Sequence, residues 1–217
     1  GDYDALYVAE PNISVRAAAA IEQWVGDGGY VFGSCGAGSR DEFNEPGPGL
    51  ARVFGIGPAI RSEVHRGEYR IRGSLNWMDY FDQVRLDRTL LLGEAAAFGV
   101  MGVKVAFTPI SSRVIGRFKT GAPAAVMQDF GRGKAVYVGA CPGLSYLKDA
   151  GFVPAELKEQ YPLVQRRVLA GLAAARGVAR LVELSQPVVE AGLYDAPAGT
   201  ALVLANFTYR PIEGLTV

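Results

Sequence analysis

The chain contains few of the residues that most often carry chemistry: one histidine, His65, and two cysteines, Cys35 and Cys141, among 217 residues. Two cysteines are too few for a scaffold built on disulfides, and their spacing matches no zinc-binding motif. A metal site at the single histidine would also need carboxylate ligands, and the sequence alone does not identify which acids would supply them. We therefore expect neither a metal ion nor a cofactor.

An excess of charge of either sign is also missing, because 22 Lys and Arg side chains balance 22 Asp and Glu side chains. A nucleic acid or an anionic membrane surface would favour a basic excess, so we expect neither as a partner. No apolar run approaches the roughly 18 residues that span a bilayer. Hydrophobic residues make up 49% of the chain and charged residues 20%, a composition that supports a folded core and excludes disorder.

The N-terminal part of the chain predicts a βαβ unit. Residues 3–9 are typical of a buried strand, and residues 17–25 carry apolar side chains at three- and four-residue spacings, with Ser14 as N-cap. A Gly-Gly pair ends this helix, and residues 30–35 form the next apolar strand. Two strands joined by a helical crossover lie parallel in one sheet.

The middle of the chain, residues 102–139, predicts β structure. Its clearest feature is a hairpin, in which residues 124–127 and 135–138 flank a Gly-rich turn. Residues 75–88 show no clear pattern. Other elements are expected at 50–54 (a short helix), 63–65 and 69–71 (edge strands), 103–107 and 114–118 (strands) and 162–176 (a helix).

The C-terminal part changes character. Residues 182–184, 188–194 and 201–207 predict a small antiparallel sheet, the start of a β-sandwich-like module. About forty residues do not bury a core of their own, so this part should dock on the preceding domain or be completed by further chain. We therefore divide the chain into domains 1–178 and 179–217, and interpret it as a piece of a longer protein.

Three stretches together resemble the trimerisation domain of bacterial β-galactosidases. They are residues 3–44, with the Gly28-Gly29 pair and Ala37-Gly38-Ser39-Arg40-Asp41-Glu42; residues 121–126 with 130–137; and residues 201–207. That domain is related to class I glutamine amidotransferases and has a flavodoxin-like fold. The resemblance implies an α/β fold, in which a mostly parallel sheet is flanked by helices and a short antiparallel β segment follows at the C-terminus.

The resemblance also implies a function. In those glycosidases the catalytic acid and nucleophile lie on a separate (β/α)₈ barrel, and the resembling domain mediates subunit contacts. We expect this chain to be a non-catalytic assembly or accessory domain of a larger carbohydrate-processing protein, and not itself the enzyme. Its expected partners are other copies of itself, other domains of the parent protein or a carbohydrate.

One alternative is a Cys-dependent amidase or hydrolase that uses Cys35. The sequence Gly33-Ser34-Cys35-Gly36-Ala37 is similar to a nucleophile elbow, and the amidotransferase relatives use such a cysteine with a downstream His and Glu. A thiol needs a base or a cationic neighbour to become a nucleophile, and the strand at 136–139 is followed by Ala140-Cys141-Pro142 without a histidine. We therefore favour Cys35 as a packed small residue.

The two cysteines both follow strands that we place in one parallel sheet, so they can lie at the same edge. A bridge would require their Cα atoms to lie within about 7 Å. The sequence does not supply that distance, and we favour two free thiols.

A second alternative is a carbohydrate-binding module. The aromatic run at residues 76–81 contains Trp77 and is either a sugar platform or part of a core or subunit contact. Asp41 and Glu42 are adjacent acids at the carboxyl end of a strand, where open α/β sheets place ligands. Neighbours in sequence seldom face each other across a substrate, so a surface ion pair or a cap is the simpler interpretation. Asp41, Glu42 and Trp77 are the candidate binding residues.

Overall fold

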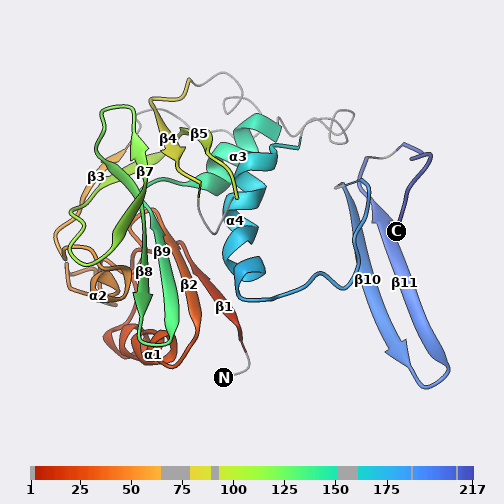
Figure 1. Cartoon of the computed structure of the whole chain (residues 1–217), viewed down its shortest axis with the longest axis horizontal. Coiled ribbons are helices and arrows are strands. Elements are labelled where there is room, and N and C mark those ends of the chain that lie inside the picture. The colour runs from red at the N-terminus through yellow and green to blue at the C-terminus, as the bar shows by residue number, and fades with distance from the viewer. Residues whose placement is uncertain (1–2, 65–78, 89–92, 151–160, 187, 209) are drawn as a thin grey trace.

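The computed structural model of the chain describes residues 3–64, 79–88, 93–150, 161–186, 188–208 and 210–217 (Figure 1). Its helices and strands, in chain order, are β1 (Ala5–Val8), α1 (Val15–Gly26), β2 (Tyr30–Ser34), α2 (Ala51–Phe54), β3 (Arg61–Val64), β4 (Asp82–Leu86), β5 (Ala96–Val100), β6 (Val103–Ala106), β7 (Arg113–Phe118), β8 (Pro123–Phe130), β9 (Gly133–Val138), α3 (Pro142–Ala150), α4 (Leu163–Ala175), β10 (Val189–Ala196) and β11 (Gly199–Asn206). Within these described parts, no helix is both long enough and apolar enough to cross a membrane.

The main sheet is mixed, and most of its strand pairs are antiparallel. Its strand order is β1-β2-β9-β8-β7-β4-β5. The β1-β2 and β2-β9 pairs are parallel, whereas the β9-β8, β8-β7, β7-β4 and β4-β5 pairs are antiparallel. Helix α4 packs against both β2 and β5, although four strands separate these two in the sheet order. The sheet therefore curls around α4.

The expected flavodoxin-like fold, with a mostly parallel sheet flanked by helices, is therefore wrong. The reason lies in the connections. Parallel neighbours need a crossover of a dozen or more residues, whereas a short turn produces an antiparallel pair. Strands β8 and β9 are joined by a tight turn that contains Gly131 at φ 58°, and short connections also precede β8. Parallel pairing is confined to the N-terminal βαβ unit and to the contact of its second strand, β2, with β9.

Strand β9 lies at the centre of the core and is buried on both faces. Ala135 and Tyr137 point into one apolar cluster, which α1 and α2 cover. Val136 and Val138 point into the other cluster, where Val168 of α4 packs. Because successive side chains of a strand point to opposite faces, a continuous apolar run such as that of β9 requires cover on both sides.

Most locally predicted elements are confirmed. The βαβ unit forms β1, α1 and β2, and the Ser14 hydroxyl accepts a hydrogen bond from the Ala17 N–H at 3.1 Å as the N-cap of α1. The short helix at 50–54 is α2, the strands at 103–107 and 114–118 are β6 and β7, the hairpin is β8-β9, and the helix at 162–176 is α4.

Other expectations differ from the structure. Residues 182–184 are not a strand, and β4, β5 and α3 were not predicted. The predicted edge strand at 63–65 corresponds to β3, which pairs with β6 in a separate two-stranded sheet. The predicted strand at 69–71 lies outside the described residues.

The hairpin of β10 and β11 lies apart from the main sheet, beyond α4 (Figure 1). Its strands pair antiparallel over eight residues each, with Leu193 opposite Leu202. Every residue of β11 is exposed. An isolated two-stranded hairpin is marginally stable in water, so its apolar side chains need further cover.

We expect Gly33→Ala to destabilise the fold by about 1–3 kcal/mol, because an added methyl group in a packed core forces strain. A Cβ at Gly33, near the end of β2, would overlap the buried ring of Phe54. Gly47→Ala is the matched control, since a Cβ there has no atom within 4 Å. Urea unfolding should show a lower midpoint for the first variant only, and equal midpoints would contradict the packing of Phe54 on β2.

Candidate functional site

The carboxyl edge of the parallel strands holds the two cysteines. Cys35 follows β2 and Cys141 follows β9, and their sulfurs form a disulfide with the Cα atoms 5.5 Å apart. The prediction that they lie at one edge is confirmed, whereas the prediction of two free thiols is wrong. Because Ser34 pairs with Val138 in the parallel register, the residues just beyond these two strands meet.

Cys35 has the backbone geometry of a residue in a tight strand-to-loop turn. Its φ is 55°, in the left-handed region that few side chains adopt. The next residue is anchored, because the Gly36 N–H donates to the buried hydroxyl of Tyr137 at 3.1 Å, and burial raises the pKa of that hydroxyl. With its sulfur in the disulfide, Cys35 carries no thiolate in this structure. His65 lies outside the described residues.

The acidic loop after β2 uses its carboxylates to hold the backbone. Asp41 Oδ1 accepts hydrogen bonds from the N–H groups of Phe43 and Glu45, both at 2.9 Å. Glu42 Oε2 accepts from the Val15 N–H at 3.0 Å, at the first turn of α1, where a negative charge is favourable. The two acids therefore point to different partners and do not face a common cavity. Trp77, the third candidate, lies outside the described residues.

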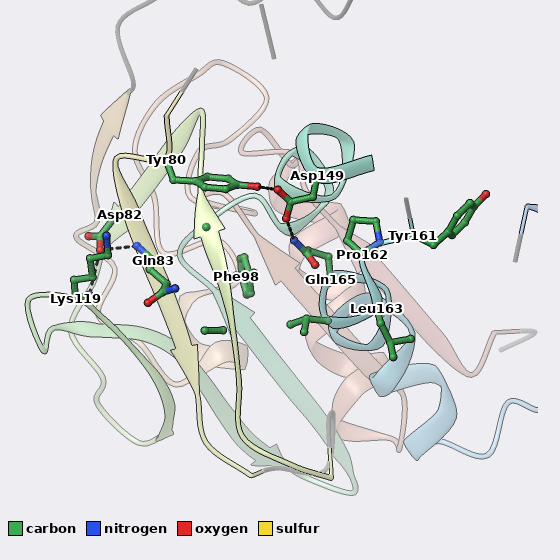
Figure 2. A pocket seen from close by; sticks show the side chains of 13 residues that line it. Tyr80, Asp82, Gln83, Phe98, Lys119, Asp149, Tyr161, Pro162, Leu163 and Gln165 are labelled. Carbon is green, nitrogen blue, oxygen red and sulfur yellow. Dashed lines mark hydrogen bonds between the residues drawn. The ribbon is translucent and has the colours of Figure 1, made fainter. Parts of the chain in front are cut away.

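A pocket of about 590 Å³ lies at the other end of the sheet order, between the β4-β5 edge and the helices α3 and α4 (Figure 2). Neither β4 nor β5 belongs to the parallel part of the sheet. Its described lining residues are Tyr80, Asp82, Gln83, Ala97, Phe98, Gly99, Lys119, Asp149, Tyr161, Pro162, Leu163, Val164 and Gln165. The pocket thus brings together side chains from segments as far apart in the sequence as Tyr80 and Gln165.

A chain of hydrogen bonds crosses this pocket. The Tyr80 hydroxyl donates to Asp149 Oδ1 (Figure 2). Gln165 Nε2 donates to Asp149 Oδ2 at 2.7 Å and to the Ser145 hydroxyl oxygen at 3.0 Å. Ser145 and Gln165 are buried, with 0% and 3% of their surface exposed. The network therefore ties the segment before β4 to α3 and α4.

The Tyr80 ring lies flat on the backbone of Gly99, where any Cβ would overlap it. The ammonium group of Lys148 lies 5.2 Å from the ring centre. Burial, followed by the hydrogen bond to Asp149, raises the pKa of Tyr80 well above its ordinary value. The hydroxyl is therefore protonated at neutral pH and acts as a donor, not as a base.

Asp82 lines the same pocket but is committed to an ion pair. Its Oδ2 lies 2.6 Å from Lys104 Nζ, and its Oδ1 accepts from the N–H groups of Gln83 at 2.7 Å and Lys119 at 3.1 Å. Burial alone would raise the pKa of Asp82, but these hydrogen bonds outweigh it and hold the pKa below its usual value. Asp82 is thus a structural carboxylate that remains ionised.

The described lining of the pocket contains no pair of a hydroxyl or thiol nucleophile with a histidine base. Nucleophilic catalysis needs a nucleophile beside a base, and the described lining residues include no Ser, Cys, Thr or His. The described parts of the chain also hold no cluster of three or more metal-ligating side chains. What the pocket offers is a fixed carboxylate, amide groups and an apolar wall.

The sequence of this chain matches no protein-family model and no curated protein. Its fold is similar to that of three β-galactosidases: the GH42 enzyme Gan42B from G. stearothermophilus (TM-score 0.68, 16% identity), the enzyme from Bacillus circulans sp. alkalophilus (0.68, 17%) and the enzyme from the psychrophilic Marinomonas ef1 (0.57, 13%).

Each of these three matches covers 94% of this chain and only 24–27% of the other chain. The chain shares its fold with one part of these β-galactosidases. The predicted resemblance to β-galactosidases is supported at the level of the fold, while the amidotransferase-like and flavodoxin-like terms are not. The chain spans about a quarter of the length of the structures it matches.

The principal polar residues of the pocket, Tyr80, Asp149 and Gln165, were not predicted as site residues. Each lies in a different segment, and none forms a motif with its neighbours. The one signal in the sequence is the aromatic run at 76–81, which includes Tyr80 beside the candidate residue Trp77.

Replacing both cysteines by serine (Cys35→Ser with Cys141→Ser) should lower the free energy of unfolding by about 2–4 kcal/mol, as expected for the loss of a bridge that closes a long loop. The bridged residues are 106 positions apart. Urea unfolding measures the change, and the reduced wild type should match the variant. Titration of two free thiols in the unreduced, denatured wild type would contradict the bridge.

Asp82→Asn should cost about 3 kcal/mol at pH 7, because it removes the carboxylate 2.6 Å from Lys104 Nζ and leaves this half-buried ammonium group only the longer 4.0 Å contact with Glu63. The pKa of Asp82 is lower in the folded state, so its contribution is present above the unfolded value of 3.8 and is lost as pH falls through the folded value. The stability gap between wild type and variant should therefore narrow below about pH 4. Urea unfolding across pH measures it, with the exposed Asp87→Asn as control; a gap that is constant with pH would contradict the ion pair.

Proposed function

We propose that the chain is a non-catalytic accessory domain of a larger glycoside hydrolase. The observation that carries this proposal is the coverage of the structural match: 94% of the chain corresponds to about a quarter of a β-galactosidase chain. A likeness of that extent is what a single domain of a multidomain enzyme would show. The proposal assigns catalysis to another part of the parent protein.

The chemistry of the described residues supports a non-catalytic role. Glycoside hydrolysis uses two carboxyl groups that flank the scissile bond, one of them a protonated acid. Asp82 and Asp149 are the two acids in the pocket. Asp82 is held as a carboxylate by Lys104, and Asp149 uses both oxygens as hydrogen-bond acceptors for Tyr80 and Gln165. Neither is placed as a proton donor.

The β10-β11 hairpin supports association with other domains of the parent protein. Leu202 and Leu204 lie on one face of β11 and Val203 lies on the other, and all three are between 39% and 54% exposed. Tyr194 adds 62% exposed aromatic surface to the face of Val203. A hairpin that is apolar on both faces is typical of a strand pair inside a larger sheet or sandwich. We propose that residues 179–217 belong to such a second domain.

The purified chain should not hydrolyse nitrophenyl β-galactoside or glutamine, with or without a reductant, because the described residues assemble neither an acid pair nor a paired thiolate. Release of nitrophenol and of ammonia measures the two reactions. The Cys35→Ala and Cys141→Ala variants are matched controls, because each lacks the disulfide but only the second keeps the Cys35 thiol.

Two results would contradict the proposal. Hydrolysis of the galactoside by the chain alone would make it catalytic. Glutamine turnover that appears after reduction, disappears in Cys35→Ala and persists in Cys141→Ala would identify a Cys-dependent amidase.

A further inference from the structure

We propose that the pocket between the β4-β5 edge and the helices α3 and α4 binds a neutral sugar unit, with Asp149 and Gln165 as the principal hydrogen-bonding groups. This inference rests on the proposed function, since it gives the accessory domain a carbohydrate to hold. It concerns binding alone and requires no reaction at this site.

The dimensions of the pocket suit a small ligand. Its volume of about 590 Å³ falls within the range of known ligand pockets, roughly 300–1,000 Å³. The wall includes apolar surface from Phe98, Pro162 and Leu163 (Figure 2). Such a wall suits the C–H face of a pyranose ring, and the polar groups lie close to it.

The carboxylate of Asp149 is held in place as a hydrogen-bond acceptor. Hydrogen bonds from Tyr80 and Gln165 fix the position of its two oxygens. An ionised carboxylate has about four acceptor sites, so sites remain for hydroxyl groups of a ligand. Asp149 itself is exposed, so a ligand can reach it without any rearrangement of the fold.

Gln165 provides a second acceptor, and its orientation follows from its partners. Its amide nitrogen faces two acceptors, Asp149 Oδ2 and the Ser145 hydroxyl, which places the amide oxygen on the opposite side. Only 3% of the surface of Gln165 is exposed. No described residue donates a hydrogen bond to its amide oxygen. A buried acceptor without a donor is costly, and a ligand hydroxyl in the pocket would supply one.

The charges around the pocket favour a neutral ligand. Asp82 is paired with Lys104, and Lys119 in the lining offsets the second acid, Asp149, so the described lining together with Lys104 holds two acidic and two basic side chains. Lys119 and the amide of Gln83 add possible donors to the lining. Fixed acceptors beside a few donors match a ligand whose hydroxyl groups each donate and accept, which is the pattern of a neutral sugar.

Calorimetric titration of the whole chain with methyl β-galactoside tests this inference. We expect saturable binding with a Kd in the millimolar range. Asp149→Asn should weaken binding about tenfold and Tyr80→Phe about threefold, because the first removes a charged acceptor and the second frees the carboxylate that Tyr80 positions. The exposed Asp87→Asn should bind like the wild type.

Three results would overturn the inference: no saturation in the millimolar range, equal binding by wild type and Asp149→Asn, or tighter binding of glucuronic acid than of the neutral galactoside. These failures are separable from failure of the proposed function. Absence of sugar binding leaves a non-catalytic domain intact, whereas galactoside hydrolysis by the chain would overturn that role even if the pocket binds sugar.

Discussion

The structure depends on strand β9, which pairs parallel with β2 on one side and antiparallel with β8 on the other. The parallel part of the sheet and its antiparallel part therefore meet at β9. Its residues Ala135 to Val138 are at most 1% exposed, and they divide between the two apolar clusters. The apolar cluster under α1 and α2 and the cluster that contains Val168 of α4 therefore meet at a single strand.

The carboxyl edge, where the sequence predicts a ligand, and the pocket lie on different parts of the sheet. The carboxyl ends of β2 and β9 are closed by the Cys35–Cys141 bridge, and the nearby loop commits Asp41 and Glu42 to backbone N–H groups. The pocket instead lies beside β4 and β5, where the sheet is antiparallel and curls toward α4. Parallel sheets usually place ligands at their carboxyl edge, and here that edge is occupied by structural contacts.

Local patterns in the sequence predicted much of the fold. The βαβ unit and the β8-β9 hairpin carry their own signals, in the spacing of apolar residues and in Gly-rich turns. The fold class failed because it depends on which distant strands pair with β9, and no local pattern encodes that choice. Helix α3 begins Pro142-Gly143 and has little intrinsic helix propensity, so its packing on α4 and β5 stabilises it.

The candidate site could be predicted from the sequence only in part. Its aromatic run at 76–81 was visible, but Tyr80, Asp149 and Gln165 are brought together by the curl of the sheet and the packing of two helices. The cysteines show the same limit. Their common edge followed from strand order, whereas the 5.5 Å separation of their Cα atoms required the register of β2 against β9.

Backbone amide chemical shifts of the ¹⁵N-labelled chain, recorded during titration with methyl β-galactoside, locate the ligand directly. If the functional surface lies at the antiparallel edge, the largest changes will occur at Tyr80, Gly99 and Gln165. Changes confined to residues 36–45 and to Cys141 would place the ligand at the carboxyl edge and contradict this assignment.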